Sequence, residues 1–193
     1  MNAYLAATEY LDWRHPAVLA KAGALGVASS PNETARRCFE FVRDEIKHSW
    51  DHRLGPVTCS ASSVLEHGTG YCYAKSHLLA ALLRANGIPA GLCYQRLSVG
   101  DSGAPYCLHG LNAIWLPEIG WYRVDARGNK PGVDAQFGPP LERLAFPLND
   151  RFEADLPEIW PDPLPVVIRA LTTWATVEEV ARNLPDVELA FRR

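Results

Sequence analysis

The chain has 193 residues, 48% of them hydrophobic, and a formal net charge of -3 at pH 7. This length and apolar content suffice for one ordinary domain with its own core, so neither a metal nor a disulfide is needed for folding, and we treat residues 1–193 as a single domain. The negative charge and the absence of a lysine or arginine run argue against nucleic acid as a partner. They favour a peptide or another small ligand.

The start of the chain and its cysteines bear on the compartment. Residues 1–10 lack the charged start and apolar stretch of a signal peptide, and no apolar segment is long enough for a membrane helix. The cysteine count is odd and contains no C-x-x-C pair: Cys38, Cys59, Cys72, Cys93 and Cys107. This usage predicts a reducing cytoplasmic location, no membrane contact, and thiols that mostly fill the core.

Two helices are predicted before the middle of the chain. Ser30-Pro31-Asn32-Glu33 is a capping box with proline at the first helical position, and apolar residues then recur at helical spacing, which predicts a helix from about Pro31 to Lys47. After a turn-rich stretch, Ser60 caps a short predicted helix over Ala61 to Glu66, which Gly68 ends.

A third helix is predicted to be buried at the centre of the fold. It begins at Cys72, directly after a turn at Gly70, and Gly87 and Pro89 stop it. One face carries a set of leucines: Leu78, Leu79, Leu82 and Leu83. The apolar face is continuous, so we expect the helix to pack against the rest of the domain.

The second half begins with strand-like runs. Ala90 to Leu97, Leu108 to Leu116 and Trp121 to Asp125 are separated by turn signals, which predicts an antiparallel sheet. Helices followed by such a sheet indicate an α+β fold.

Beyond Gly128 the chain is rich in proline and is expected to wrap the domain. Two helices are predicted there, near Leu164 to Trp174 and near Val177 to Asn183. Thr176 and Glu179 form a capping box for the second.

Cys72 is the first candidate for chemistry. The first turn of a helix offers unpaired N–H groups and the positive end of the helix dipole, and both favour a thiolate. A nucleophilic thiolate also needs a basic or cationic partner, usually histidine, and a third group that orients the histidine.

His109 and Asp125 fit those two roles on one condition. If residues 116–120 form a five-residue hairpin loop, Trp115 faces Trp121, and His109 lies on the same sheet face as Asp125. A four-residue loop would place them on opposite faces. If the helix of Cys72 packs on the face that they share, the three side chains meet.

These residues resemble a known family. Gly70-Tyr71-Cys72 at a helix start precedes Leu-Leu-Ala-Ala-Leu-Leu-Arg-Ala-Asn-Gly-Ile-Pro-Ala at 78–90, His-Gly-Leu-Asn-Ala-Ile-Trp-Leu at 109–116 and Gly-Trp-Tyr-Arg-Val-Asp at 120–125. Together they look like the bacterial transglutaminase-like, papain-related cysteine enzymes. The resemblance covers roughly residues 60–128, and three motifs in the right order are far more specific than one.

The resemblance implies an α+β papain-like core over about residues 30–130, followed by a proline-rich wrap at 131–193. It implies that Cys72 attacks an amide carbonyl, that His109 activates the thiol and protonates the leaving amine, and that Asp125 orients His109. The Cys72 backbone N–H would serve in the oxyanion hole, for which the sequence identifies no second donor. No cofactor is implied. The acceptor of the thioester is water in a hydrolase and an amine in a transglutaminase.

Each residue also has a structural alternative. Taken singly, Cys72 is more often an inert core cysteine, and His109 and Asp125 are more often structural. A papain-like domain kept as a binding module, with its site covered by the proline-rich segment, is a rival of a different class. The oligomeric state is not indicated.

Other residues have weaker cases for function. His48 and His52 lie four apart but lack a third metal ligand, so zinc is disfavoured. His67 and His77 are expected to be structural. Trp115, Trp121 and Tyr122 are expected in core packing rather than in a substrate groove, and the loop 98–104 is expected to be a connection rather than a flap.

Overall fold

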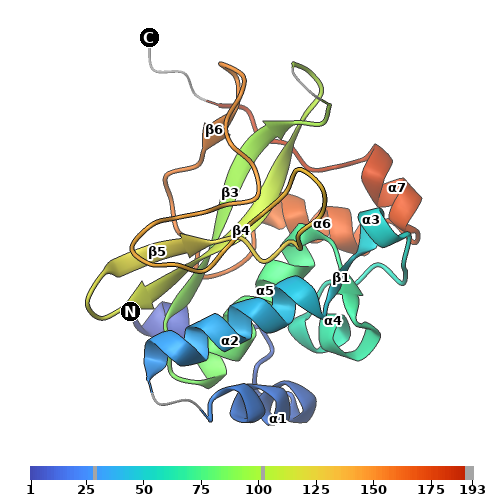
Figure 1. Cartoon of the computed structure of the whole chain (residues 1–193). Helices are drawn as coiled ribbons and strands as arrows, with labels where there is room; N and C mark the ends of the chain where they lie inside the picture. Colours follow the sequence, from blue (N-terminus) through green and yellow to red (C-terminus); the bar gives the residue numbers. More distant parts are fainter. Residues whose placement is uncertain (28–29, 101–102, 190–193) are drawn as a thin grey trace.

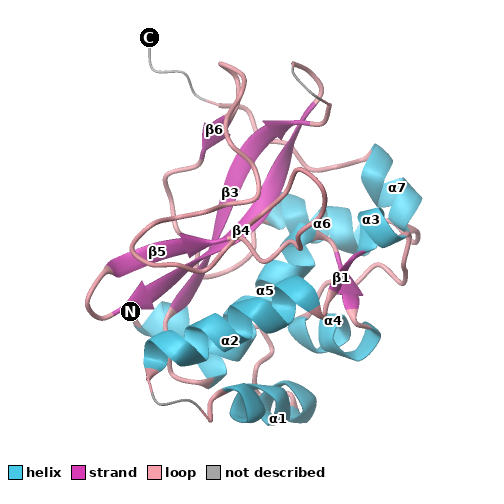
Figure 2. Cartoon of the chain, viewed as in Figure 1, coloured by secondary structure: helices cyan, strands magenta, loops and turns pink. Residues whose placement is uncertain are grey.

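A computed structural model describes residues 1–27, 30–100 and 103–189. Figure 2 shows helices gathered on one side of the molecule and strands on the other, which is the predicted α+β arrangement. Within the described residues no helix is both long and apolar enough to cross a membrane.

The first half of the chain is mainly helical. Its elements are the 3-10 helix η1 (Asn2–Leu5), α1 (Pro16–Leu25), α2 (Pro31–Asp44), α3 (Ser49–His52) and α4 (Ala61–His67). The predicted caps are confirmed, because the Ser30 and Ser60 hydroxyls accept the N–H groups of Glu33 and Ser63. Gly68 ends α4 in the left-handed conformation, with φ of 63°.

The predicted helix Pro31 to Lys47 is three residues too long. The strand β1 (Lys47–His48) begins there instead and pairs in parallel with β2 (Thr69–Gly70). The buried Lys75 amine donates to the carbonyls of Ile46 and Arg43 and so satisfies groups that the end of α2 leaves open.

The helix α5 (Cys72–Ala85) is the centre of the fold, as predicted, and its side chains from Cys72 to Arg84 are buried. It packs against α1, α2, α4 and the sheet. At its far end the Arg84 guanidinium donates to three backbone carbonyls, those of Ala6, Ala90 and Pro161. One buried cation therefore joins segments from the beginning, middle and end of the chain.

The main sheet has the order β5-β4-β3-β6. Its strands are β3 (Ala90–Ser98), β4 (Tyr106–Leu116), β5 (Gly120–Val124) and β6 (Ala154–Asp155), and all its pairings are antiparallel. Trp115 lies opposite Trp121, which is the register expected from the five-residue loop. The two-residue β6 was not predicted.

The two faces of the sheet have different partners. Leu108, Ile114 and Val124 face the main core around α5, whereas Cys93, Leu111 and Ala113 form a second cluster with Leu144 and Ile159. Figure 1 shows the segment that follows β5 crossing the sheet on the side away from α5. The segment after residue 128 therefore covers the second face.

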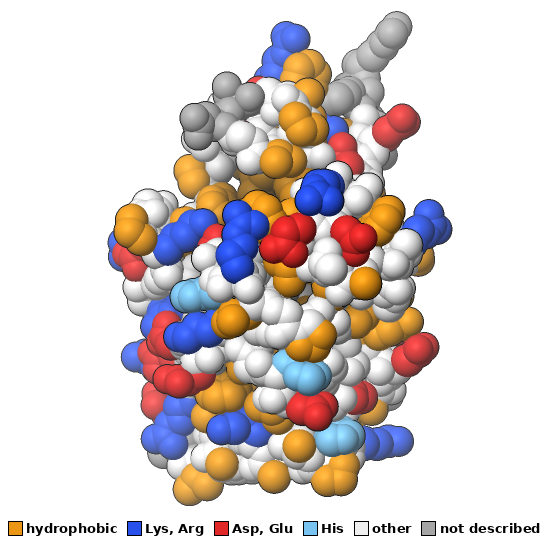
Figure 3. Space-filling view, turned by 90° about the vertical axis from the view of Figure 1, so that its right-hand side faces the viewer, with side chains coloured by type: hydrophobic (Ala, Val, Ile, Leu, Met, Phe, Trp, Pro, Cys, Tyr) orange, Lys and Arg blue, Asp and Glu red, His pale blue; other side chains and the backbone are white. Residues whose placement is uncertain are grey.

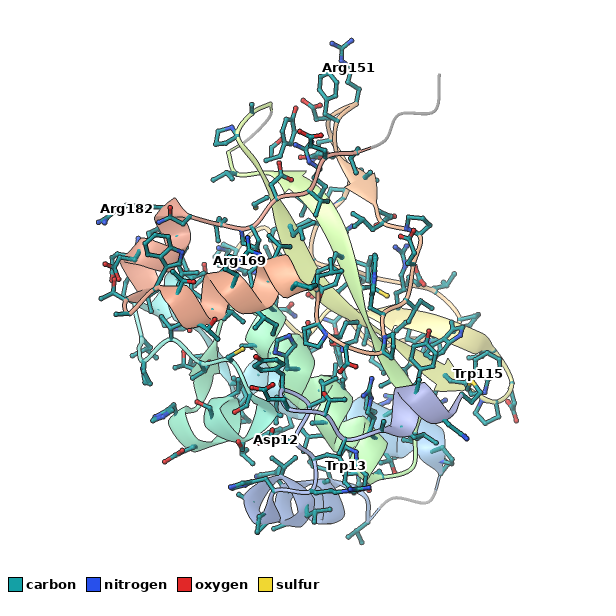
Figure 4. All side chains as sticks on the ribbon, turned by 180° about the vertical axis from the view of Figure 1, so that it is seen from behind. Asp12, Trp13, Trp115, Arg151, Arg169 and Arg182 are labelled. Atoms are coloured by element: carbon teal, nitrogen blue, oxygen red, sulfur yellow. The ribbon has the colours of Figure 1, made fainter. Side chains whose placement is uncertain are left out.

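Two helices follow this segment, α6 (Pro165–Thr173) and α7 (Val177–Arg182). The predicted capping box of Thr176 and Glu179 is present in full. In Figure 4, Arg169 marks α6 and Arg182 marks α7, and Trp115 at the β4–β5 hairpin lies on the other side of that view.

The close approach of β4 to the start of α5 yields a test. A Cβ built on Gly110 would lie 3.1 Å from Tyr73 Cα and 3.2 Å from Tyr73 N. Because backbone cannot move aside easily, we expect Gly110→Ala to lower the free energy of unfolding by about 1–3 kcal/mol. Urea denaturation measures this loss.

Gly23→Ala is the matched control. Gly23 lies in α1, and a Cβ there meets nothing within 4 Å. Alanine in a helix should leave the free energy of unfolding unchanged or raise it by about 0.5–1 kcal/mol. Equal effects of the two substitutions would contradict the steric account of Gly110.

Candidate active site

A cavity of about 540 Å³ opens at the N-terminal end of α5. Cys72 and His109 lie in its wall. The remaining lining residues are their neighbours at 71–73 and 107–109 and residues from five other segments, namely 48–51, 97–100, 127–130, 146–153 and 181–184. Figure 3 faces the side that carries α3 and α7, where acidic and basic side chains are interspersed.

Cys72 is fixed by contacts between the first turn of α5 and β4. Its side chain is 7% exposed, and the Gly110 N–H donates to its Sγ at 3.4 Å. The Tyr73 hydroxyl donates to the Leu108 carbonyl. The thiol is thus held against the strand that carries His109.

His109 and Asp125 lie on the same face of the sheet, as predicted, but the helix of Cys72 packs on the other face. Side chains alternate along a strand, so Leu108 and Ile114, which face α5, put His109 on the opposite face with Leu111. The groups meet because β5 ends at Val124 and leaves the edge of β4 open at Gly110. The thiol lies at this open edge of β4 and can therefore approach His109 on the other face of the sheet.

His109 interacts with both other candidates. Its Nε2 lies 2.7 Å from Asp125 Oδ2, and the ring also interacts electrostatically with Cys72. The Phe146 ring stands edge-on to the imidazole at 5.0 Å between centroids. Burial by itself would lower the pKa of His109, but the negative charges of Asp125 and Cys72 and the hydrogen bond to Asp125 raise it to about 10.

Asp125 is fully buried and heavily hydrogen-bonded. Besides His109, the backbone N–H groups of Arg127 and Ala145 donate to its carboxylate, each at 3.1 Å. Burial would raise the pKa of Asp125, but the charge of His109 and these hydrogen bonds hold it below its ordinary value. The carboxylate is therefore an anion that can fix one orientation of the imidazole.

A second polar group in the cavity was missed by the sequence reasoning. Asp51 forms ion pairs with Arg127 at 2.7 Å and with Lys130 at 2.8 Å, and Arg127 also approaches His48 Nδ1 at 3.4 Å. From the sequence, His48 is considered only together with His52, as a metal-binding pair that lacks a third ligand. Arg127 follows β5, 79 residues from His48, and no local pattern links the two.

The remaining candidates lie outside this arrangement. His77 is a buried residue of α5 with Nδ1 at 2.8 Å from the Cys59 carbonyl, and burial lowers its pKa to about 4 despite that bond. Trp115 and Trp121 pack on each other. In the described part of the chain, no three His, Cys, Asp or Glu side chains form a group that could hold a metal.

The loop predicted at 98–104 contributes its first residues to the cavity wall, Ser98, Val99 and Gly100. Residues 101 and 102 lie outside the described residues. Burial raises the pKa of each of the other four cysteine thiols to about 12: Cys38, Cys59, Cys93 and Cys107.

A protein-family model described as the transglutaminase-like superfamily matches residues 20–126, which is more than half of the chain. The match includes Cys72, His109 and Asp125. No protein with curated annotation matches the chain.

One solved structure shares the fold, and a second gives a weaker superposition. A candidate cysteine protease from Cytophaga hutchinsonii superposes with a TM-score of 0.53 and 18% identity over 64% of this chain and 40% of that one. The periplasmic domain of TgpA from Pseudomonas aeruginosa gives a TM-score of 0.47 and 23% identity over 64% of this chain and 45% of that one. The aligned part spans less than half the length of either solved chain.

The charge state of His109 can be tested by titration. Because Asp125 and Cys72 favour the imidazolium, we expect His109 to keep both ring protons at pH 8 and to lose one near pH 10, whereas His77 stays neutral down to about pH 4. NMR of ¹⁵N-histidine-labelled protein reads both transitions. Asp125→Asn should lower the His109 transition, and a His109 that titrates near 6.5 in the wild type would contradict the ion pair.

Proposed function

Since the chain belongs to the transglutaminase-like superfamily, we propose that it is a cysteine-nucleophile enzyme that cleaves an amide bond of a peptide or small amide. Cys72, His109 and Asp125 are the proposed nucleophile, base and orienting group. The observation that carries the proposal is that His109 lies 2.7 Å from Asp125 and lines one cavity with Cys72, whose thiol accepts the N–H of Gly110, the residue after His109.

The proposed chemistry begins with a thiolate–imidazolium pair. The cationic His109 and the N-terminus of α5 both favour the thiolate form of Cys72. The thiolate attacks the amide carbonyl, and the electron pair of the C=O bond moves to oxygen. When the C=O bond forms again, the C–N bond breaks, His109 gives its proton to the leaving amine, and a Cys72 thioester remains.

Water then completes the cycle. His109, now neutral, takes a proton from the water that attacks the thioester. The C–S bond breaks, the acid leaves, and the thiolate–imidazolium pair is restored. We favour hydrolysis because the cavity is open to solvent, so that water can reach the thioester. Transfer to an amine follows the same path with a different acceptor and is the alternative.

A product assay tests the proposal. The purified protein is given a panel of acyl-p-nitroanilides, and p-nitroaniline release is followed with and without methylamine. Hydrolysis predicts the free acid as the main product under both conditions, whereas an N-methylamide as the main product would indicate a transferase. We expect Cys72→Ala and His109→Ala to lower kcat by about 10⁴-fold or more, because the groups act as a unit.

Cys107→Ala is the matched control, because Cys107 lines the same cavity but makes no contact with His109 that the structure records. It should keep close to full activity. Turnover that survives Cys72→Ala would contradict the proposed nucleophile. No turnover of any substrate, with tight binding of a peptide, would favour the binding-module alternative.

The cytoplasmic location expected from the sequence remains a prediction, and one solved neighbour is a periplasmic domain. Fractionation of cells that express the tagged full-length protein would locate it.

A further inference from the structure

His48 lies next to the start of the nucleophile helix. In the parallel pair of β1 and β2, His48 is the partner of Gly70, two residues before Cys72. Tyr71 is extended, with φ of −63° and ψ of 163°. His48 lines the same cavity as Cys72 and His109, and it is close enough to His109 for the two charges to interact.

The hydrogen bonds of His48 fix its tautomer. The imidazole is the N-cap of α3, where Nδ1 accepts the Asp51 backbone N–H at 3.4 Å. Nδ1 also faces the Arg127 guanidinium at 3.4 Å, and a guanidinium can only donate. The Asp51 carboxylate is farther from Nδ1, at 3.6 Å. Nδ1 is therefore an acceptor, and the ring proton is on Nε2.

The ring is also held neutral. Burial lowers the pKa of His48 well below its ordinary value, and the charges of Arg127, Lys75 and His109 lower it further. Asp51 opposes this but divides its charge between Arg127 and Lys130. His48 thus offers an N–H donor that brings no second cation close to His109.

The Nε2–H group has no partner among the described residues. The side chain is only 7% exposed, and its surroundings are the Tyr71 ring at 5.6 Å and the cavity that holds Cys72. Nε2 is not among the fully enclosed side-chain atoms without a hydrogen bond, so solvent can still reach it. Because His48 lines the cavity, Nε2 is reachable from there.

We propose that His48 is a further catalytic residue, whose Nε2–H donates to the carbonyl oxygen of the acyl group while Cys72 attacks it. This inference rests on the proposed acyl transfer at Cys72. As the C–S bond forms, the π electron pair of the carbonyl moves onto oxygen, and a fixed donor stabilises that negative charge. Together with the Cys72 backbone N–H, His48 completes an oxyanion hole.

Trp50 is the other N–H donor that must be distinguished, because its indole also lines the cavity. It is half-buried, and the Arg53 guanidinium lies over its ring at 3.3 Å. No strand pairing ties it to the residues before Cys72. The geometry therefore favours His48.

Two reagents separate an oxyanion donor from other effects. Iodoacetamide alkylates Cys72 by displacement at carbon, and no oxyanion forms. With p-nitrophenyl acetate, the thiolate adds to the carbonyl, an oxyanion forms, and p-nitrophenolate leaves as the acetyl thioester is made. The alkylation rate is measured at Cys72. The acylation rate of Cys72 is taken from the p-nitrophenolate burst that remains after the burst of Cys72→Ala is subtracted.

The variants are His48→Phe, His48→Gln and the controls Trp50→Phe and His52→Phe. We expect His48→Phe to slow acylation by about 10-fold or more and to change alkylation less than about 3-fold, since one oxyanion donor is worth about 10²–10³ in rate. His48→Gln keeps an N–H donor and should recover part of the loss. Both controls should keep the wild-type ratio of the two rates. His48→Leu replaces His48→Phe if circular dichroism shows that the latter is unfolded.

Failure of the inference and failure of the proposed function give different results. If the wild type reacts rapidly with both reagents but His48→Phe slows both equally or neither, the inference is overturned and Cys72 chemistry stands. A selective loss of acylation in Trp50→Phe would overturn it in favour of the indole. If wild-type Cys72 reacts with neither reagent faster than the other cysteines do, the proposed function is contradicted. The inference about His48 is then contradicted as well, because it rests on that function.

Discussion

The contact between the first turn of α5 and the edge of β4 governs the rest of the candidate site. Gly110 has no side chain, so the strand can approach the Tyr73 backbone closely, and the Gly110 N–H then reaches Cys72 Sγ at 3.4 Å. This is possible only where β5 has ended and left the edge of β4 open. One short contact thus brings a thiol from the core side to a histidine on the other face of the sheet.

The charges of the site persist because the surrounding backbone satisfies them. A buried ion pair is costly unless hydrogen bonds complete it. Asp125 receives two backbone N–H groups besides the imidazole, one of them from Ala145 in the segment that wraps the sheet. Phe146 packs on His109 from the same segment. The proline-rich half of the chain therefore contributes to the electrostatics of the site as well as covering the sheet.

Local signals predicted much of the fold. The serine and glycine caps located α4 and the start of α2, alternating apolar residues located β3, β4 and β5, and the length of one loop set the register that aligns His109 with Asp125. The helix α1 was missed, since Val18 and Ala22 are its only buried residues. The two-residue strands β1, β2 and β6 form only because distant segments pair with one another. The hydrophobic periodicity of the sequence does not indicate such pairing.

The site was predicted less completely, for a similar reason. Cys72 follows a recognisable turn, and the hairpin register links His109 with Asp125, but the side of the sheet from which the thiol approaches depends on where β5 ends. The role of His48 can be inferred only from the structure, in which Asp51 and Arg127 surround its Nδ1. Such arrangements depend on tertiary contacts across many residues, so spacing alone cannot reveal them.

The central claim is that Cys72 and His109 form an activated pair. The most direct measurement is the pH dependence of alkylation of each cysteine by iodoacetamide, read by peptide mass spectrometry in the wild type and in His109→Ala. The account predicts fast labelling of Cys72 well below pH 8.5, about the ordinary pKa of a free cysteine, and its loss in the variant. Labelling of Cys72 no faster than that of the other four cysteines, and unaffected by His109, would contradict it.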